Sequence, residues 1–404
     1  MPTTPPPPGP LAEHFVLDPT IAFLNHGSYG ACPRRVLEEQ SRIRAHMERE
    51  PVEFFMVDME RQMDEARGRL AAWLGCDSAG LVPVPNATTG VATALWNHPL
   101  ELGDEILVND HEYSACISEA KRLAKTKHLT VREVSLPWPV QHEDQIVDAL
   151  LEGVTPKTKL AILSWITSPT AIVLPAARLV REFRARGVEV ILAGAHAPGQ
   201  IDVDIESVSP AYFTANMHKW PCAPKGSGVL WIAPKYREGF EPLVLSARAH
   251  LDRPDRSRLL ALFDYTGTSD YTAFLTAPAA VDIISEIGGG WDAIRAHNAS
   301  LARRGRDIIC ERLGIEPPAP DTMLGTMASL VLPGDGLASG GTRPGGYEDP
   351  LQERLVRTHR VQVPVWRLPS RRARMLRISA QIYNTEAQYA HLADALAEEL
   401  AAHA

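Results

Sequence analysis

The chain has 404 residues, of which 45% are hydrophobic and 22% charged, enough to bury a large core in about two domains. Its net charge of -8, with acidic and basic residues mixed along the chain, excludes the basic footprint of a protein that binds nucleic acid or an anionic membrane surface. The five scattered cysteines lack CxxC spacing, and no signal peptide or membrane-length apolar run is seen, so we expect a cytoplasmic protein with no metal site that acts on a small molecule.

The opening MPTTPPPPGP is proline-dominated and predicts an extended, solvated arm over residues 1–20. Helical spacing of apolar residues predicts helices over 35–50 and 58–74, the second ending at Gly75. Short apolar runs then alternate with helix-like segments such as 176–186. The predicted strands are 105–108, 130–136, 160–166, 188–192 and 228–232.

These alternating runs favour an α/β domain over 21–276 with a mostly parallel sheet, in which ligands bind at the carboxyl ends of the strands. After residue 277 the pattern changes to long amphipathic helices and a few short strands. We therefore predict a smaller C-terminal α+β domain over 277–404, with a flexible loop at 336–346.

Lys219 lies in a polar turn, NMHKW, just before a glycine-punctuated strand. A lone lysine is usually a solvated surface charge, so this position alone is a weak signal. Seven further motifs accompany it. In chain order the eight are FLNHGSYGACP (23–33), VPNATTGV (84–91), NDHEYSA (109–115), TSPTAIVLP (167–175), GAHAPGQ (194–200), NMHKW (216–220), YTGTSD (265–270) and LRISAQIYN (376–384).

With these motifs the chain resembles class V aminotransferase-fold enzymes, most closely the isopenicillin N epimerase-like branch. The resemblance runs from about residue 23 to 400 and implies the PLP-dependent transferase fold, fold type I. It also implies that pyridoxal 5'-phosphate is held as a Schiff base on Lys219, which would then carry a proton at the substrate α-carbon.

The phosphate of the cofactor is expected at the start of a helix, where free backbone N–H groups and the helix dipole attract anions. An ordinary threonine N-cap is the alternative interpretation of this segment. By resemblance, two residues of a second subunit also reach the phosphate, which implies a homodimer with its site at the interface. The expected phosphate residues are Ala87, Thr88, Thr89, Asn216 and His218, with Gly267 and Thr268 from the partner.

Tyr113 matches the aromatic position that stacks on the cofactor ring, although a core tyrosine is the alternative. Ser168 and His196 are also expected at the cofactor. Arg377, in LRIS, matches the residue that binds the substrate carboxylate, for which a guanidinium offers two parallel hydrogen bonds; a surface arginine is the alternative.

Three residues of NHGSYG, namely Asn25, His26 and Ser28, match a loop that borders the substrate pocket. A tight turn with a hydrogen-bonded structural histidine is the competing interpretation of this loop.

Three positions depart from the family pattern. Ala193 stands where relatives carry an aspartate that keeps the pyridine nitrogen of the cofactor protonated. Trp165 replaces a frequent histidine and is expected either to contact cofactor or substrate or to lie in the core. Ser269 replaces an arginine of the usual GTRD sequence.

Loss of the aspartate weakens the electron sink, which argues against a plain aminotransferase and favours epimerisation or β-elimination, including C–S bond cleavage. An aminotransferase or an oxidative deaminase of the same family is the second hypothesis. A noncatalytic ligand-binding relative, or an engineered aspartate-to-alanine variant, is the third.

Overall fold

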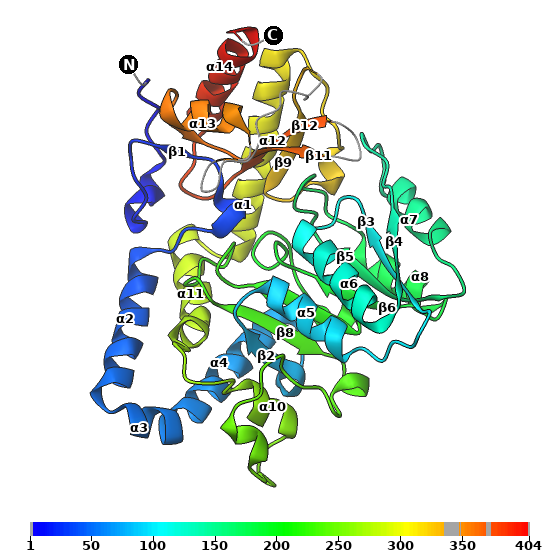
Figure 1. Ribbon diagram of the computed structural model, residues 1–404. Coiled ribbons are helices and arrows are strands. Elements are labelled where there is room, and N and C mark those ends of the chain that lie inside the picture. Colours follow the sequence, from blue (N-terminus) through cyan, green and yellow to red (C-terminus); the bar gives the residue numbers. More distant parts are fainter. Residues whose placement is uncertain (1–2, 335–346, 348, 369–372, 403–404) are drawn as a thin grey trace.

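The computed structural model describes residues 3–334, 347, 349–368 and 373–402. A large sheet with helices on both faces forms one part of the molecule, and a smaller helix-and-sheet layer forms the other (Figure 1). The predicted loop at 336–346 lies outside the described residues.

The large sheet has seven strands in the order β2-β8-β7-β6-β5-β3-β4. Strands β3 to β7 pair in parallel, whereas β8 is antiparallel to both β7 and β2, so the sheet is mostly parallel as predicted. The strands are β2 (Leu81–Val84), β3 (Glu105–Asn109), β4 (Thr130–Val134), β5 (Thr158–Ser164), β6 (Glu189–Ala193), β7 (Tyr212–Asn216) and β8 (Gly228–Ile232). An apolar strand before residue 87 was expected without bounds and is β2, whereas β7 was not predicted.

Helices cover both faces of this sheet, and the strands bury apolar side chains on each side. Along β6, Ile191 and Ala193 pack on the side of α5 (Ala87–Asn97) and α6 (Ser114–Lys127). Val190 and Leu192 pack on the side of α7 (Glu143–Glu152) and α8 (Ala176–Arg184). This alternation follows from the two-residue period of a strand, and it decides which residues of β6 face the α5 side.

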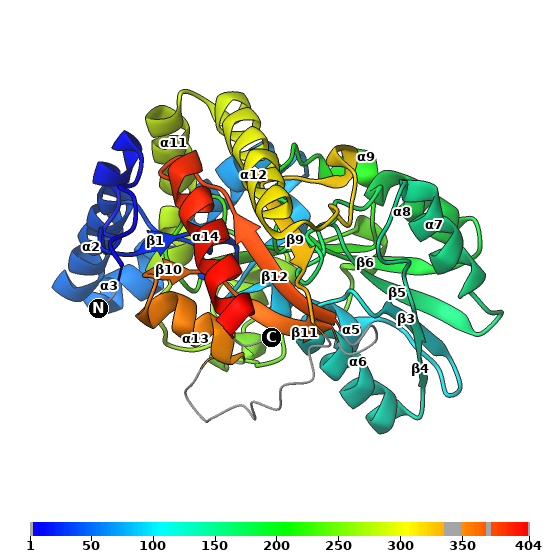
Figure 2. The ribbon, with the colours of Figure 1, turned by 90° about the horizontal axis from the view of Figure 1, so that it is seen from above.

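The smaller part contains the antiparallel sheet β11-β12-β9, covered by two long helices, α12 (Trp291–Leu313) and α14 (Glu386–Ala402), as Figure 2 shows. The strands are β9 (Met327–Val331), β11 (Val365–Leu368) and β12 (Ala373–Ser379). Among the described residues, no helix combines the length and the apolar composition needed to cross a bilayer.

Two predicted helices appear close to their expected bounds, as α2 (Arg34–Arg49) and α4 (Met59–Leu74). The second ends at Gly75, whose left-handed backbone (φ 62°) is the predicted stop. Both pack on α11 (Thr272–Gly288). Shorter elements complete the fold: α1 (His26–Tyr29), α3 (Pro51–Glu53), α9 (Ile205–Val208), α10 (Arg258–Phe263), α13 (Pro350–Arg357), β1 (Ala22–Phe23) and β10 (Val361–Gln362).

The N-terminal arm is not a free solvated segment, and that prediction is wrong for its described part. The Thr3 backbone N–H donates to the Thr358 carbonyl oxygen, and the Gly9 N–H donates to that of Tyr383. Phe15 is buried and lies edge-on to the Tyr383 ring, with centroids 4.9 Å apart. Prolines favour an extended backbone only up to a short 3-10 helix at Pro10–His14, and contacts with residues more than 350 positions away hold the arm on the C-terminal part.

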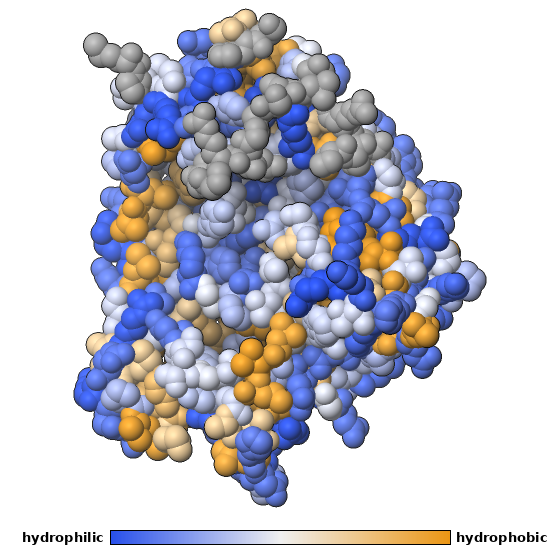
Figure 3. Space-filling model, viewed as in Figure 1, coloured by the Kyte–Doolittle hydropathy of each residue, from blue (hydrophilic) through white to orange (hydrophobic). Residues whose placement is uncertain are grey.

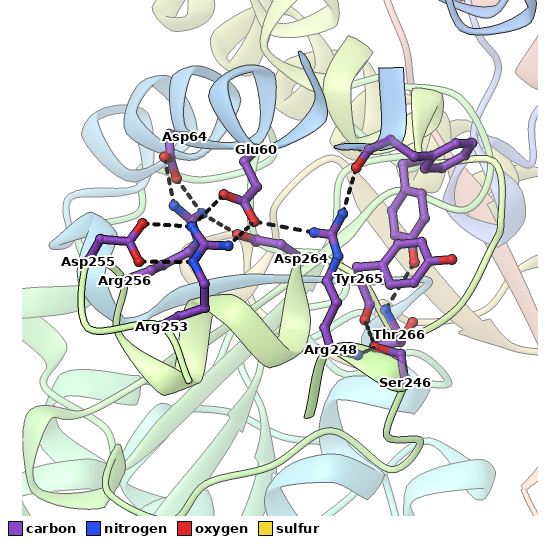
Figure 4. Close-up of polar contacts among 12 residues, drawn as sticks. Glu60, Asp64, Ser246, Arg248, Arg253, Asp255, Arg256, Asp264, Tyr265 and Thr266 are labelled. Atoms are coloured by element: carbon purple, nitrogen blue, oxygen red, sulfur yellow. Dashed lines mark hydrogen bonds and ion pairs between the residues drawn. The ribbon is translucent and has the colours of Figure 1, made fainter. Parts of the chain in front are cut away.

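Arginines and carboxylates tie the segment 246–268 to α4 (Figure 4). Asp264 is fully buried and accepts hydrogen bonds from Arg67 and Arg256, and Arg67 also donates to the Leu81 carbonyl oxygen. Arg253 forms a two-pronged pair with Glu60. Buried charges are tolerated only when they are paired, so this cluster determines where the segment lies.

Asp264→Ala should therefore lower the free energy of unfolding by about 3–5 kcal/mol, because it removes the buried carboxylate from Arg67 and Arg256 and leaves them only the half-exposed Asp64. Urea denaturation of the variant measures this loss. The matched control is Asp394→Ala, which removes the exposed partner of Arg312 and should change stability by about 1 kcal/mol or less. Equal losses in the two variants would contradict the structural role assigned to Asp264.

Candidate active site

A cleft lies at the carboxyl ends of β5, β6 and β7, where it extends to α5 on one side and β12 on the other. It has two lobes, with volumes of about 570 Å³ and 310 Å³. The residues that line both lobes are Ser28, Tyr29, Glu112, Tyr113, Ser168 and Lys219. Lys219 thus lies at the junction of the lobes, where groups bound in either one can reach it.

The Lys219 side chain is surrounded by protein and has no carboxylate partner among the described residues. Its Nζ lies 3.1 Å from His196 Nε2, and the indole N–H of Trp220 donates to His196 Nδ1 at 3.3 Å. Burial, and then the positive charge of Arg377, lower the pKa of Lys219 to about 7. A large fraction of this amine is therefore neutral near neutral pH, the form that attacks a carbonyl carbon or accepts a proton.

Burial lowers the pKa of His196 well below its usual value, so the ring is neutral. With Nδ1 accepting from Trp220, the single ring proton lies on Nε2 and points to Lys219 Nζ. The histidine thus donates to the neutral amine and holds it in the cleft.

The smaller lobe ends at the first turn of α5. Thr88 lines this lobe, and its backbone N–H has no hydrogen-bond partner among the described residues. Asn216 Oδ1 accepts from the Ala87 N–H at 2.8 Å and so ties the helix start to β7. The helix can approach β7 because residue 90 is glycine; a Cβ there would overlap Thr214 Oγ1. A helix N-terminus held in this way attracts a phosphate group.

His218 also lines this lobe, and burial lowers its pKa to about 4. Its Nδ1 lies 3.0 Å from the Ser227 carbonyl oxygen, which can only accept a hydrogen bond. The ring proton is therefore on Nδ1, and Nε2 gains a proton only in the cationic form. A phosphate dianion nearby would favour that cation and raise the pKa of His218.

Arg377 lies in the wall of the larger lobe and is only 4% exposed. Its Nη1 donates to the Ser168 carbonyl oxygen at 2.7 Å and to Ser168 Oγ at 3.0 Å, and Nη2 donates to Ser28 Oγ at 3.3 Å. Burial lowers its pKa to about 10, yet no carboxylate pairs with it within the described residues. A buried cation without a partner anion, facing a cavity, is suited to bind an anionic ligand.

Tyr113 lines both lobes and is 48% exposed, so the alternative of a core tyrosine is wrong. Its backbone N–H donates to Glu112 Oε1 at 2.8 Å. The aromatic ring is therefore available to a ligand that enters the cleft between the lobes.

The floor of the smaller lobe contains two residues that the sequence analysis did not single out, Ser164 and Glu112. Glu112 Oε1 accepts from Ser164 Oγ at 2.5 Å, and Oε2 accepts from the Ser164 backbone N–H at 2.7 Å. Ala193 pairs with Ser164 across β5 and β6 and lines the same lobe. Glu112 belongs to the NDHEYSA motif, and Ser164 lies within the predicted strand 160–166; these were the available signals.

Several predicted site residues do not reach the cleft. His26 is fully buried, with Nδ1 at 2.8 Å from the Tyr383 hydroxyl and Nε2 at 3.0 Å from the Lys219 carbonyl oxygen, so the structural interpretation fits its position. Asn25 is buried and accepts from the Ser28 hydroxyl. Thr89 donates to the N-cap residue Asn86 instead of lining the lobe.

Trp165 lies on the opposite face of the sheet from its neighbour Ser164. Its ring packs edge-on against Phe213, with centroids 6.1 Å apart, among core residues. The predicted contact with cofactor or substrate is therefore wrong, and the core alternative describes this residue.

Gly267 and Thr268 do not line the cleft of their own chain, and Thr268 is exposed. Thr268 Oγ1 lies 2.7 Å from the Tyr265 hydroxyl, and the Tyr271 hydroxyl donates to the Gly267 carbonyl oxygen at 2.6 Å. Neighbouring tyrosines thus hold this turn at the surface.

Comparison with known proteins identifies relatives of the whole chain. The family model described as aminotransferase class-V matches residues 31–334. Isopenicillin N epimerase of Streptomyces clavuligerus is 32% identical, with 95% of this chain and 96% of that protein covered. A probable chloroplastic L-cysteine desulfhydrase of Arabidopsis thaliana is 26% identical, with 94% and 83% covered.

The fold is also found in a solved complex between the cystine C-S lyase C-DES and its reaction product cysteine persulfide. The TM-score is 0.76 at 21% identity, with 94% of this chain and 97% of that chain covered. The family model covers most of the chain, and a relative with more than 30% identity covers nearly all of it. This chain belongs to the aminotransferase class-V family of pyridoxal-phosphate-dependent enzymes.

Proposed function

We propose that this enzyme uses Lys219 to hold pyridoxal phosphate and to move a proton at the α-carbon of an amino-acid substrate, leading to epimerisation or to β-elimination with C–S cleavage. One observation carries the proposal: the buried, carboxylate-free Arg377 and the low-pKa Lys219 face the same cleft. Relatives named isopenicillin N epimerase and L-cysteine desulfhydrase support both outcomes.

The cleft residues fit the cofactor. The first turn of α5, with His218 and Asn216, offers donors for a phosphate, and Lys219 offers a neutral amine within the same lobe. Tyr113 lies at the junction, where its ring can cover one face of a bound aromatic group. When bound, pyridoxal phosphate supplies an electron sink for the bond that is broken at the α-carbon.

The protein contributes binding, orientation and proton transfer. Arg377 binds the α-carboxylate and fixes the substrate so that its α-carbon lies near Lys219. The neutral amine of Lys219, which its contact with His196 holds in the cleft, then turns its lone pair to the substrate and accepts the α-proton. Delivery of a proton to the opposite face, from a donor other than Lys219, inverts the centre, and loss of a β-substituent gives elimination.

Lys219→Ala should abolish covalent capture of pyridoxal phosphate. Trapping the wild-type adduct with borohydride and sequencing the labelled peptide by mass spectrometry should locate it at residue 219. Lys225→Ala is the matched control, because Lys225 is six residues away and its Nζ donates to the Gly30 carbonyl oxygen. A label on another lysine of the wild-type protein would contradict the assignment.

Capture should also depend on pH in a defined direction. Burial lowers the pKa of Lys219 to about 7, so the reactive neutral amine is lost as the pH falls through 7 and is fully present above it. The capture rate should rise through pH 7 and then level off, whereas an ordinary lysine would continue to gain toward pH 10. Stopped-flow absorbance of the adduct measures this profile.

Arg377→Gln should raise KM for the amino-acid substrate by roughly tenfold to a hundredfold, because a charge-assisted hydrogen bond contributes about 1.5–3 kcal/mol. Arg374→Gln is the control: Arg374 lies on the same strand but pairs with Asp349. Steady-state kinetics should show an effect in the first variant and little in the second. An unchanged KM in Arg377→Gln would contradict carboxylate binding at this residue.

Reaction type can be separated by incubating candidate amino acids in deuterated water. We expect α-proton exchange, with either inverted product or, for S-substituted cysteines, ammonia and a keto acid. NMR and enzymatic assays of the products distinguish these outcomes. If the protein captures the cofactor but exchanges the α-proton of no amino acid in a broad panel, a noncatalytic ligand-binding function would be favoured instead.

We further propose that the enzyme is a homodimer in which Gly267 and Thr268 reach the cofactor phosphate of the partner. Support comes from exposed apolar side chains beside their turn. Met56 and Val57 are 73% and 58% exposed, and their neighbour Phe55 lies edge-on to Tyr265 at 6.1 Å. Figure 3 shows apolar patches that interrupt the polar surface on the lower part of this face.

Met56→Glu should therefore shift the protein from dimer to monomer and weaken retention of pyridoxal phosphate, because the partner's turn would be lost. Sedimentation velocity and cofactor dialysis measure the two effects. Leu102→Glu is the control, since Leu102 is 80% exposed and is distant in sequence from this turn. A wild-type protein that sediments as a monomer would contradict the dimer.

A cytoplasmic location also remains a proposal. It is supported by five cysteines that are all unpaired in the structure, a pattern expected of a reducing compartment.

A further inference from the structure

The floor of the smaller lobe is unusual because its central β6 residue, Ala193, offers only a methyl group. In pyridoxal phosphate the ring nitrogen is para to the carbon that carries the aldehyde. When that carbon is bonded to Lys219 and the phosphate lies at α5, the nitrogen must lie on the ring edge directed away from Lys219. The residues that line this lobe apart from the Lys219 turn and the first turn of α5 include Ala193 of β6, Ser164 of β5 and Cys116 of α6.

The strand register places a hydroxyl group beside Ala193. Ser164 and Ala193 are paired residues of the parallel strands β5 and β6, so their side chains project from the same face of the sheet. That face is the α5 side, because Ala193 packs in the cluster that contains residues of α5 and α6. The next residue of the chain, Trp165, projects to the other face. Ala193 also pairs with Thr214 of β7, but the Thr214 hydroxyl donates to the Val229 carbonyl oxygen, and of these two neighbours only Ser164 lines the lobe.

Ser164 is itself held by a buried acid. Its hydroxyl donates to Glu112 Oε1 at 2.5 Å and its backbone N–H donates to Oε2 at 2.7 Å, while Oε1 also accepts from the Tyr113 N–H at 2.8 Å. Glu112 is 4% exposed and forms no salt bridge within the described residues. Burial raises the pKa of Glu112, and the donors of Ser164, Tyr113 and Cys116 oppose that shift because they favour the ionised carboxylate.

The Ser164 hydroxyl uses its proton toward Glu112, which leaves its oxygen lone pairs free to accept. A thiol is a poorer partner, and the Cys116 thiol is itself hydrogen-bonded to Glu112. Ser164 is therefore the lining group best suited to meet a ring N–H.

We propose that the Ser164 hydroxyl, with the Glu112 carboxylate behind it, takes the place of the absent aspartate as the hydrogen-bond partner of the cofactor's pyridine nitrogen. Ser164 accepts a hydrogen bond from the protonated nitrogen and donates a hydrogen bond to Glu112, so no covalent bond is broken. The Ser164 hydroxyl then separates the negative charge of Glu112 from the nitrogen. This inference rests on the proposed capture of pyridoxal phosphate by Lys219. Ser164 contacts the cofactor itself, and Glu112 acts through Ser164 as a positioning residue.

The test uses the full-length protein loaded with pyridoxal phosphate that carries ¹⁵N in the ring. Protonation moves a pyridine nitrogen strongly upfield, and a hydrogen bond moves it less, so the ¹⁵N shift reports on this contact without any assay of activity. The wild-type resonance should lie upfield of an unbound pyridine nitrogen. Ser164→Ala and Glu112→Gln should each move it downfield, and Ala193→Asp should move it further upfield.

The same strand offers a matched control. At the other end of β5, the Thr158 hydroxyl donates to the buried Glu105 carboxylate at 2.6 Å. Thr158→Val and Glu105→Gln remove an equivalent pair that does not line the cleft, and should leave the ¹⁵N shift unchanged. If Ser164→Ala does not fold or retain the cofactor, Glu112→Gln and the hydroxyl-retaining Ser164→Thr decide the question.

An unchanged resonance in both Ser164→Ala and Glu112→Gln would overturn the proposal, as would a wild-type nitrogen already at the unbound value. In Ser164→Thr, which keeps the hydroxyl, the resonance should stay near the wild-type position. A downfield shift as large as that of Ser164→Ala would also contradict the proposal. Failure of the proposed function is distinguishable, because the wild-type protein would then show no adduct at Lys219 and no bound ¹⁵N signal.

Discussion

Two buried basic side chains, Lys219 and Arg377, face one cleft without a carboxylate partner among the described residues, and most of the site can be understood from this constraint. Burial lowers the pKa of both groups, and the charge of Arg377 lowers that of Lys219 further, so Lys219 is partly neutral near pH 7 while Arg377 stays charged. The proposed function assigns one anion to each lobe: an α-carboxylate pairs with Arg377, and a phosphate binds at the first turn of α5.

The fold brings these groups together because strands that are distant in sequence end at the same edge. Lys219 follows β7, His196 follows β6, Ser168 follows β5, and Arg377 comes from β12 of the smaller part. Hydrogen bonds between Arg377 and Ser168 then connect the two parts of the molecule across the cleft. Movement of one part relative to the other would change the geometry of the carboxylate site directly.

Much of the fold and part of the site could be predicted from the sequence. Short apolar runs predicted five strands and a mostly parallel sheet. The NMHKW motif identified Lys219 as a candidate site residue. The predicted contact of Trp165 with cofactor or substrate was wrong. Side chains of a strand alternate between its two faces, so if Ser164 faces the cleft, the next residue, Trp165, faces the core.

Other features depend on contacts that local patterns do not encode. Glu112 and Ser164 are 52 positions apart, so their pairing appears only once the sheet has formed. The N-terminal arm is similar, since its prolines predict an extended backbone but its docking depends on the carbonyl oxygens of Thr358 and Tyr383. His26 looked like a pocket residue because its motif borders the cleft, yet its ring points to Tyr383 and the Lys219 backbone.

Ala193 offers a methyl group where the family resemblance implies a carboxylate, and this bears on the proposed chemistry. A hydroxyl group is a much weaker base than a carboxylate, so a nitrogen that faces Ser164 keeps its proton less firmly and withdraws electrons less strongly. Reactions that need a long-lived carbanion suffer most from this change. Rapid return of a proton by Lys219, or rapid loss of a β-substituent, shortens the lifetime of that carbanion. A weak sink beside a low-pKa lysine is therefore better matched to epimerisation or β-elimination than to transamination.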